Sequence, residues 1–314
     1  MTSTQTPELV ATALGYQTAD AEIVDYRIWK IKTAQSALAV RGPRPKSLKP
    51  GEYCTSIGAA YTFGRFAPQP YPYLLGKALN ISSLNLGFSG VGPSFYNQPR
   101  NQVIVDLINA SKFVTISLFS GRSQDNSQFK TAWYSQEQYV LEDGQVVPAD
   151  YAYQAFLENN DSQATMALLQ ETRARYLDEF IQLLEKITVP KVLLWFSKRS
   201  PDYEASSDSL FKLFGGFPQM VNLAMVETLK PYCEEYVEYV STSGLPQPLV
   251  NRRTQQPVTI ERSRDYQAGK IQLTSSWLTH NSYYPSPEMH AGVTQALVPA
   301  CKSLYSQISY HLSK

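Results

Sequence analysis

The stretch that decides the fold is Tyr-Cys-Thr-Ser-Ile-Gly-Ala-Ala-Tyr-Thr-Phe-Gly-Arg, residues 53–65. Its first five residues, 53–57, carry the aromatic and branched side chains that are typical of a strand. Gly58 and Gly64 follow, and glycine at the end of a strand indicates a turn. In an open α/β sheet, the loops after the carboxyl ends of the strands carry the functional site. The sequence therefore predicts a strand over 53–57 with a functional turn directly after it.

Strand-like and helix-like segments alternate along the chain on both sides of this stretch. The strand-like runs are residues 53–57, 82–86, 113–119, 191–196 and 236–240. The helix-like segments are residues 71–79, 102–110, 162–187 and 219–231. The runs at 114–119 and 192–196 are mainly apolar, as is usual for parallel strands that are covered on both faces. This pattern predicts a three-layer α/β/α sandwich with a mainly parallel sheet.

The remaining segments predict how this domain is organised. Residues 1–22 are polar and rich in Thr and Ala, which predicts a flexible N-terminal arm. Residues 23–314 are expected to form one α/β domain. It carries polar insertions at 122–161, 197–218 and 244–276, and the last of these is expected to include a hairpin.

Composition excludes several classes of function. The formal net charge of the 314 residues is +1, so no global basic field attracts nucleic acid. No stretch approaches the roughly 18 apolar residues that a membrane-spanning helix needs, and no signal peptide is recognisable, so we expect a soluble cytoplasmic protein. The three cysteines are widely spaced, and no metal-binding or phosphate-loop motif occurs. We therefore expect no metal site, and the sequence leaves the oligomeric state open.

Four short blocks follow the predicted strands. Gly-Ala-Ala-Tyr-Thr-Phe-Gly begins at Gly58, Asn-Leu-Gly-Phe-Ser-Gly at Asn85, Gly-Arg-Ser-Gln at Gly121, and Asn-Ser-Tyr-Tyr-Pro at Asn281. In this order they resemble the four blocks of the SGNH/GDSL hydrolase superfamily, over roughly residues 53–297. The chain also resembles a divergent bacterial group that shares Arg-Gly-Pro-x-Pro, here residues 41–45, and the Thr-Phe-Gly-Arg turn. The resemblance implies an SGNH-type α/β/α fold.

The catalytic positions of that superfamily are replaced in this chain. The nucleophilic serine is matched by Ala60, the aspartate of the last block by Asn281 and its histidine by Tyr284. An alanine methyl group can neither attack a carbonyl nor accept a proton. His290, downstream of the last block, matches the histidine that often opens the last helix and not the family's catalytic base. His290, or alternatively His280, is the plausible proton carrier that remains.

The resemblance also implies an oxyanion hole. Its backbone donor would be Gly90, with Gly87 shaping the turn, because glycine lets a substrate approach the amide closely. The family's asparagine donor is matched by Ser123, whose hydroxyl can still donate one hydrogen bond. Asn126 lies near enough in sequence to take that role if the loop bends.

Cationic side chains follow three of the predicted strands, at Arg65, Arg122 and Arg199. In a parallel sheet they would converge at one edge, where guanidinium groups suit phosphate, sulfate or carboxylate. The functional interpretation is an anionic substrate or group donor of nucleotide or coenzyme type. The alternative is that each arginine is solvated or held in an ion pair.

Two functional hypotheses follow. The first is an enzyme that transfers or cleaves an acyl or sulfuryl group on a carbohydrate or secondary metabolite, without a serine nucleophile. His290, Tyr284 and Ser123 would be catalytic, and the substrate would be bound by Arg65, Gly87, Gly90, Arg122, Asn126, Arg199 and Asn281. The alternative is a catalytically inactive SGNH-like protein whose cleft binds a small-molecule ligand.

Overall fold

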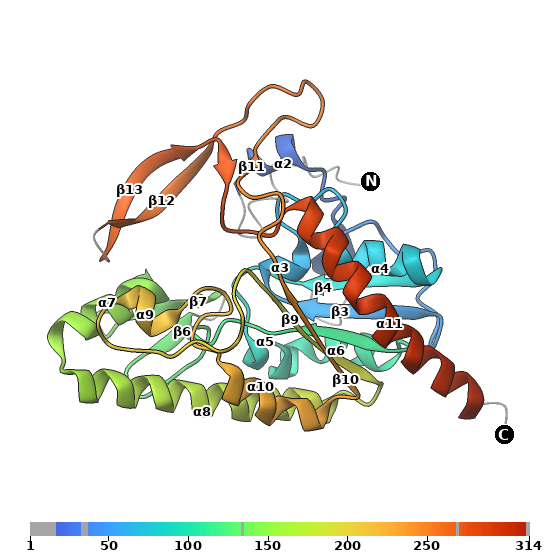
Figure 1. Cartoon of the computed structure of the whole chain (residues 1–314), viewed down its shortest axis with the longest axis horizontal. Helices are drawn as coiled ribbons and strands as arrows, with labels where there is room; N and C mark the ends of the chain where they lie inside the picture. Colours follow the sequence, from blue (N-terminus) through green and yellow to red (C-terminus); the bar gives the residue numbers. More distant parts are fainter. Residues whose placement is uncertain (1–16, 33–36, 133–134, 268–269, 312–314) are drawn as a thin grey trace.

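A five-stranded parallel sheet forms the centre of the molecule (Figure 1). The computed structural model describes residues 17–32, 37–132, 135–267 and 270–311. The strands of the sheet are β3 (Tyr53–Gly58), β4 (Ser82–Gly87), β5 (Val114–Ser117), β9 (Lys191–Ser197) and β10 (Glu235–Val240). Their spatial order is β10-β9-β5-β3-β4, so the chain crosses over the sheet after its second strand. This is a doubly wound order, in which the carboxyl ends of all five strands share one edge.

Helices cover both faces of this sheet. One face carries α3 (Ala60–Phe63), α4 (Tyr71–Leu79) and α11 (Pro287–His311), and α4 contacts α11. The other face carries α5 (Pro93–Asn97), α6 (Gln102–Asn109), α8 (Ser162–Lys186) and α10 (Leu223–Leu229). Here α8 contacts both α5 and α10, and both α8 and α10 lie below the sheet in Figure 1. The predicted α/β/α sandwich with a parallel sheet is confirmed.

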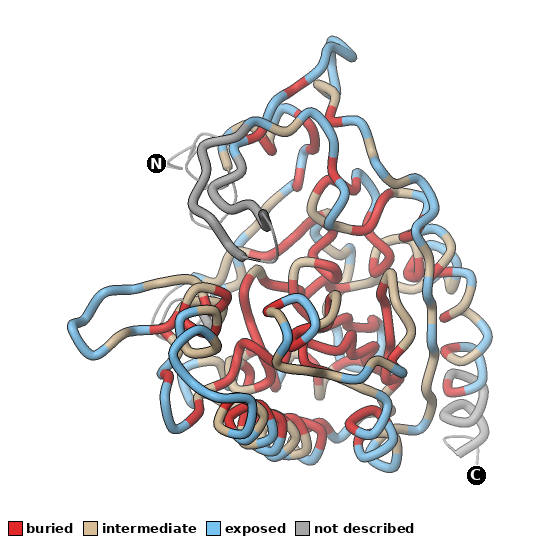
Figure 2. Tube along the Cα trace, turned by 60° about the vertical axis from the view of Figure 1, so that its left-hand side comes forward, coloured by how far each residue is buried: buried red, intermediate tan, exposed pale blue. Residues whose placement is uncertain are grey.

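The apolar runs of the sequence form the main core. Every residue of β3 and β5 is buried, because helices lie against both of their faces, and Figure 2 shows this concentration of buried residues around the sheet. The helix predicted over 71–79 has those bounds. The helix predicted from 219 begins only at Leu223, because the Asn222 side chain accepts a hydrogen bond from the Met225 amide and caps it there. Short 3-10 turns, Pro99–Asn101 and Lys230–Tyr232, precede α6 and follow α10.

The first two insertions pack together into a cap beside the sheet. The cap consists of β6 (Lys130–Ala132), β7 (Ser135–Val140), β8 (Val146–Pro148), α7 (Ala149–Asn159), α9 (Leu210–Phe214) and the N-terminal part of α8. The three strands form an antiparallel sheet of their own. Aromatic residues of the cap, among them Phe129, Tyr139 and Tyr153, form a second hydrophobic core. These insertions are therefore polar in composition but not in their interior.

The remaining segments are one short helix and three antiparallel strand pairs. They are α2 (Asp20–Ile23), the paired strands β1 (Trp29–Lys32) and β2 (Ala37–Val40), the short pair β11 (Gln247–Pro248) and β14 (His280–Asn281), and the hairpin β12 (Ile260–Gln267) and β13 (Lys270–Leu278). Most of the predicted arm, residues 1–16, lies outside the described residues, whereas α2 packs in a third apolar cluster. Within the described residues, no helix combines the length and the apolar character needed to cross a membrane.

Candidate functional site

Tyr283 connects the loops at the carboxyl edge of the sheet. Its backbone carbonyl accepts a hydrogen bond from the hydroxyl of Tyr61 in α3, over 2.8 Å. Its own hydroxyl accepts one from the Gln219 amide group, over 3.0 Å. The Lys198 ammonium group, which follows β9, donates to the carbonyl of the neighbouring Ser282 over 2.8 Å. Tyr283 as a whole residue remains 40% exposed, so part of it is accessible to solvent where these loops meet.

The positions that match the catalytic triad form no nucleophile and base pair. Ala60 is half-buried at the start of α3. The Asn281 oxygen accepts the amide hydrogens of Tyr283 and Tyr284, at 3.1 and 2.9 Å. The Asn281 amide group donates to Gln247 and to the Tyr284 carbonyl. Asn281 therefore folds its own loop, and its polar atoms point into that loop.

Two of the predicted site residues, Tyr284 and Arg65, lie in contact, and Arg65 also binds a buried carboxylate. Arg65 donates to the Tyr284 hydroxyl over 3.1 Å. The same guanidinium group binds both oxygens of Asp20, at 2.7 and 3.0 Å, and the Asp20 side chain is fully buried. The charge of Arg65 is thus balanced inside the protein by a residue of α2.

His290 lies in the core between α11 and α4, away from the loops of the edge. Its Nδ1 accepts the Tyr71 backbone amide over 3.2 Å, at the first residue of α4. Its ring packs against those of Tyr71 and Phe196 and has no exposed surface. Burial, together with the charge of Arg41, lowers the pKa of His290 to about 3. The ring is neutral near pH 7, and this placement leaves it out of a site that solvent reaches.

The other two predicted arginines are held by the protein itself. Arg122 is buried and forms ion pairs with Asp150 and with Glu137, the latter over 3.3 Å. Arg199 donates to four backbone carbonyls, those of Ser200, Gly216, Pro218 and Val221. Its guanidinium group also lies over the rings of Trp195 and Tyr203. Arg122 thus matches the ion-pair alternative, whereas Arg199 is held by backbone carbonyls, which neither alternative foresaw.

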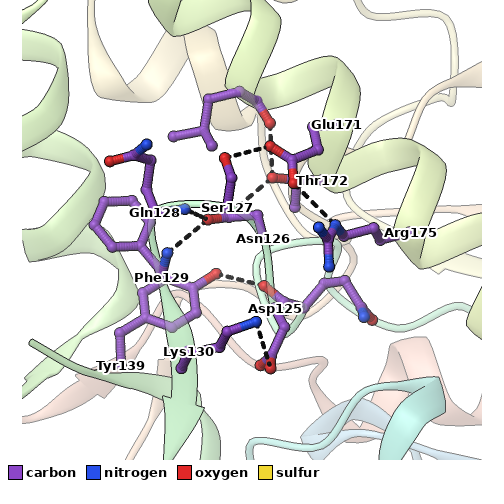
Figure 3. Close-up of polar contacts among 12 residues, drawn as sticks. Asp125, Asn126, Ser127, Gln128, Phe129, Lys130, Tyr139, Glu171, Thr172 and Arg175 are labelled. Atoms are coloured by element: carbon purple, nitrogen blue, oxygen red, sulfur yellow. Dashed lines mark hydrogen bonds and ion pairs between the residues drawn. The ribbon is translucent and has the colours of Figure 1, made fainter.

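Asn126 faces the cap (Figure 3). Its amide nitrogen donates to the Tyr153 hydroxyl over 2.9 Å and to Thr172 over 3.1 Å. Its side-chain oxygen accepts the backbone amides of Gln128 and Phe129. All the polar capacity of this buried side chain is used to fix the turn into β6, so no donor remains for a developing oxyanion.

The two glycines of the second block differ. The Gly87 amide donates to the Asn85 side chain over 2.9 Å. A Cβ atom at Gly87 would lie 2.4 Å from the backbone nitrogen of Phe63, so glycine is needed there for the packing of α3 on β4. Gly90 is buried and has a φ of +65°, and its amide has no hydrogen bond to any described residue. Of the two, Gly90 has the available donor.

Four buried polar atoms belong to the loop that follows β5 and to the segment that is hydrogen-bonded to it. They are the hydroxyls of Ser120 and Ser123 and the side-chain oxygens of Gln124 and Gln219, which we call the Ser–Gln cluster. None has a hydrogen-bond partner among the described residues, and none of the four residues is more than 5% exposed. Gly121 holds the two segments together, because its amide donates to the Gln219 carbonyl over 2.8 Å. Buried polar groups are normally paired, so such a concentration marks a place for water or ligand atoms.

A pocket opens on the outer side of this loop. It has a volume of about 550 Å³ and lies between α5, α8 and the turn into β6. Gln124 lines it, together with polar side chains that include Asn97, Asp125, Arg175 and Gln182. Gln124 is thus shared between the Ser–Gln cluster and the pocket. Among the described residues, no three His, Cys, Asp or Glu side chains are placed to hold a metal ion.

One protein family matches most of the chain. The family described as Domain of unknown function (DUF6473) matches residues 15–132 and 155–305. The chain belongs to this family. The match leaves out residues 133–154, which hold β7, β8 and the first part of α7. In this DUF6473 chain, the α/β body and the loops of its carboxyl edge therefore belong to the shared part.

Two solved structures resemble this DUF6473 chain at low identity. One is a mutant of Axe2, an acetyl-xylooligosaccharide esterase from Geobacillus, with a TM-score of 0.38 and 11% identity over 80% of this chain and 94% of that one. The other is a gut microbial diltiazem-metabolizing enzyme, with a TM-score of 0.37 and 12% identity over 80% of this chain and 47% of that one. No curated protein matches the sequence. At these scores the likeness assigns no activity to the chain.

Three residues at the carboxyl edge lie outside the predicted set. Two of them could have been found from the sequence: Tyr283 is a loop tyrosine, and Lys198 is a cation at the end of a predicted strand. Nothing in the sequence marks Gln219 as a site residue, because it falls at the start of a segment that is predicted as helix. Its proximity to Gly121 depends on the fold of residues 197–222.

Proposed function

We propose that the carboxyl edge of the sheet binds an uncharged polar small molecule, of which a carbohydrate is the leading class. The observation that carries this proposal is the Ser–Gln cluster, whose four buried polar atoms lack partners among the described residues. Hydroxyl and carboxamide groups exchange hydrogen bonds with the hydroxyls of a sugar without a charge on either side. The nearby charges of Arg65 and Arg122 are already balanced by Asp20, Asp150 and Glu137.

Tyr283 would supply the apolar part of this recognition. Its exposed ring lies beside Gln219, and the face of an aromatic ring packs well on the C–H face of a sugar. The Tyr283 backbone is fixed by Tyr61 and Asn281, so little conformational freedom is lost on binding. This pairing of a fixed ring with buried uncharged acceptors favours a neutral ligand over an anionic one.

The absence of a nucleophile and base pair supports binding over serine-type hydrolysis. Ala60 offers no hydroxyl, Asn281 is used within its own loop, and His290 is buried and neutral. The Tyr284 hydroxyl already accepts a hydrogen bond from Arg65 within the protein. The ligand-binding alternative of the sequence analysis is therefore the function that we put first.

One observation favours group transfer as a second candidate. The amide of Gly90 and the hydroxyl of Ser123 are the two expected oxyanion donors, and both lack a partner among the described residues. The oxygen of an acceptor hydroxyl bound at this edge would then form the new ester bond to an acyl or sulfuryl donor directly, with no enzyme-linked intermediate. The bond between the transferred group and the donor's leaving group breaks, and the hydroxyl proton passes to that departing group. The two candidates differ in whether the bound molecule turns over.

A binding screen with matched serine variants tests the first candidate. We expect neutral oligosaccharides to bind the full chain in calorimetry, and Ser123→Ala to weaken that binding about tenfold, the effect of one hydrogen bond. Ser127→Ala is the control, because Ser127 lies in the same loop but its exposed hydroxyl donates to Glu171 on the outer surface. If no oligosaccharide binds, or if the two variants weaken binding equally, the proposal is wrong. Turnover of p-nitrophenyl acetate that Ser123→Ala abolishes would instead support group transfer or hydrolysis.

A further inference from the structure

A groove with four cationic side chains lies at the opposite end of the sheet from the Ser–Gln cluster. It has a volume of about 650 Å³ and runs between the C-terminal part of α4, the start of β4 and the loop over residues 43–46. Its four cationic side chains are Arg27, Arg44, Lys46 and Lys77, and we call this groove the basic groove. Tyr73, Asn80, Ser82 and Ser83 also line it.

The charge of the basic groove is not balanced locally. No aspartate or glutamate is among its lining residues. In the part of the chain that the structure describes, none of the four cations forms an ion pair. The nearest acid in sequence, Asp25, accepts the Arg27 backbone amide and pairs with Arg252. In a protein of net charge +1, four cations around one groove create a local field that attracts anions.

A buried arginine builds the loop that brings these cations together. Arg41 is 1% exposed and donates to the carbonyls of Tyr26, Gly42 and Ala67. The Gly42 amide also donates to the Tyr26 carbonyl, over 3.1 Å. A Cβ atom at Gly42 would lie 2.0 Å from the Arg27 carbonyl oxygen, so only glycine permits this approach. The Arg-Gly-Pro-Arg-Pro segment is thus pinned against residues 26–27, and the pinning places Arg44 beside Arg27.

Aromatic rings lie beside three of the four cations. The Tyr73 ring lies 5.6 Å from the Arg27 guanidinium carbon and 5.7 Å from the Lys77 nitrogen. The Arg44 guanidinium carbon lies 5.4 Å from the centre of the Trp29 ring. The Arg27 backbone has a φ of +47°, a conformation that is unusual for a residue with a side chain. A costly backbone geometry that points a cation into a groove is expected where that cation has a function.

We propose that the basic groove binds the diphosphate or polyphosphate part of a phosphorylated small molecule. Two guanidinium groups can each hold phosphate oxygens through paired hydrogen bonds, and two ammonium groups add point charges. The volume is that of a small-molecule site and leaves room for one organic group beside the phosphates. This site is separate from the carboxyl edge, and its proposal does not depend on the proposed function.

Calorimetry with pyrophosphate, ADP and adenosine tests this proposal on the full chain. We expect pyrophosphate and ADP to bind, adenosine not to bind, and added salt to weaken binding because the charges are exposed. Arg44→Ala and Lys77→Ala should each lower the affinity about tenfold, the effect of losing a hydrogen bond to a charged group. Lys212→Ala is the control, because Lys212 is an exposed lysine of the cap that pairs with Asp208. It should leave the affinity unchanged.

Three results would overturn the proposal. The first is that neither pyrophosphate nor ADP binds. The second is that binding is insensitive to Arg44→Ala and Lys77→Ala, or equally sensitive to Lys212→Ala. The third is that a single-stranded oligonucleotide binds through Arg44 and Lys77 more than about tenfold tighter than pyrophosphate, as an extended electrostatic surface would. Circular dichroism of the variants separates lost binding from lost folding, since all the substituted lysine and arginine side chains are exposed.

Discussion

Asp20 is the buried counterion of Arg65, and it gives this strand-end arginine a structural role. The sequence offers Arg65 as an anion-binding group after the first strand, and the fold supplies its counterion from α2, 45 residues earlier in the chain. Asp20 is fully buried, and the Arg65 side chain is 11% exposed. A buried pair of this kind is costly to break from one side, because the remaining charge stays in the protein without a partner.

The first prediction concerns this pair. Asp20→Asn should lower the free energy of unfolding by about 3 kcal/mol, since Arg65 would lose its buried counterion. Asp208→Asn, which breaks the exposed pair with Lys212, should shift the unfolding midpoint much less. Urea unfolding of both variants at pH 7 measures the difference. Equal shifts of the two midpoints would show that the buried position of the Asp20 pair has no special importance.

The second prediction is a pH dependence from His290. Its pKa is lowered from 6.5 to about 3 in the folded chain, first by burial and then by Arg41. Between these values the unfolded chain binds a proton that the folded chain does not, so stability is full above pH 6.5 and falls as the pH decreases toward 3. This one group contributes a slope of up to about 1.4 kcal/mol per pH unit.

His290→Asn keeps a hydrogen-bond acceptor for the Tyr71 amide and removes the titration. Its unfolding free energy, measured by urea titration from pH 6.5 downward, should therefore decrease less steeply than that of the unchanged chain. The variant is expected to be less stable at neutral pH because packing is lost. The slope of the unfolding free energy against pH, however, reports the titration of His290. An unchanged slope would mean that His290 is not held neutral by the fold.

At the scale of elements, the loop after β5 has two sides with different roles. Ser120 and Ser123 face the interior of the carboxyl edge without partners among the described residues. Asn126 is fully bonded and ties the same loop to α7 through Tyr153 and to α8 through Thr172. One short loop thus carries candidate ligand contacts at one end and a structural anchor at the other.

The third prediction tests that anchor. Asn126→Asp keeps the oxygen that accepts the Gln128 and Phe129 amides but loses both donated hydrogen bonds and buries a charge. We expect a loss of about 3 kcal/mol at pH 7. Asn159→Asp is the control, since Asn159 is exposed at the end of α7, and it should change stability by less than about 0.5 kcal/mol. Thermal unfolding by circular dichroism compares them, and similar midpoints would rule out the anchoring role.

At the scale of the whole molecule, the sequence predicts the body better than the cap or the site. The strands at 53–57 and 191–196 can be predicted from the sequence, because the first carries aromatic and branched side chains and the second is an apolar run. The core of the cap could not be predicted from the sequence. It is built in part from Tyr139 and Tyr153, whose hydroxyl groups give the insertion a polar composition. Partners such as Asp20 for Arg65 join segments that are distant in sequence, and a single sequence carries no trace of such pairs.

The fourth prediction asks whether body and cap unfold as one unit. The helix α8 runs through both cores, with Leu169 in the cap core and Leu183 in the main core, and both leucines are fully buried. Each Leu→Ala change should cost about 2 to 5 kcal/mol. Because one continuous helix joins the cores, we expect both variants to shift a single shared transition in urea. Hydrogen exchange resolved by segment gives the readout: if Leu169→Ala raised exchange in α7 and α9 while β3 and β9 kept their protection, cap and body would be separate folding units.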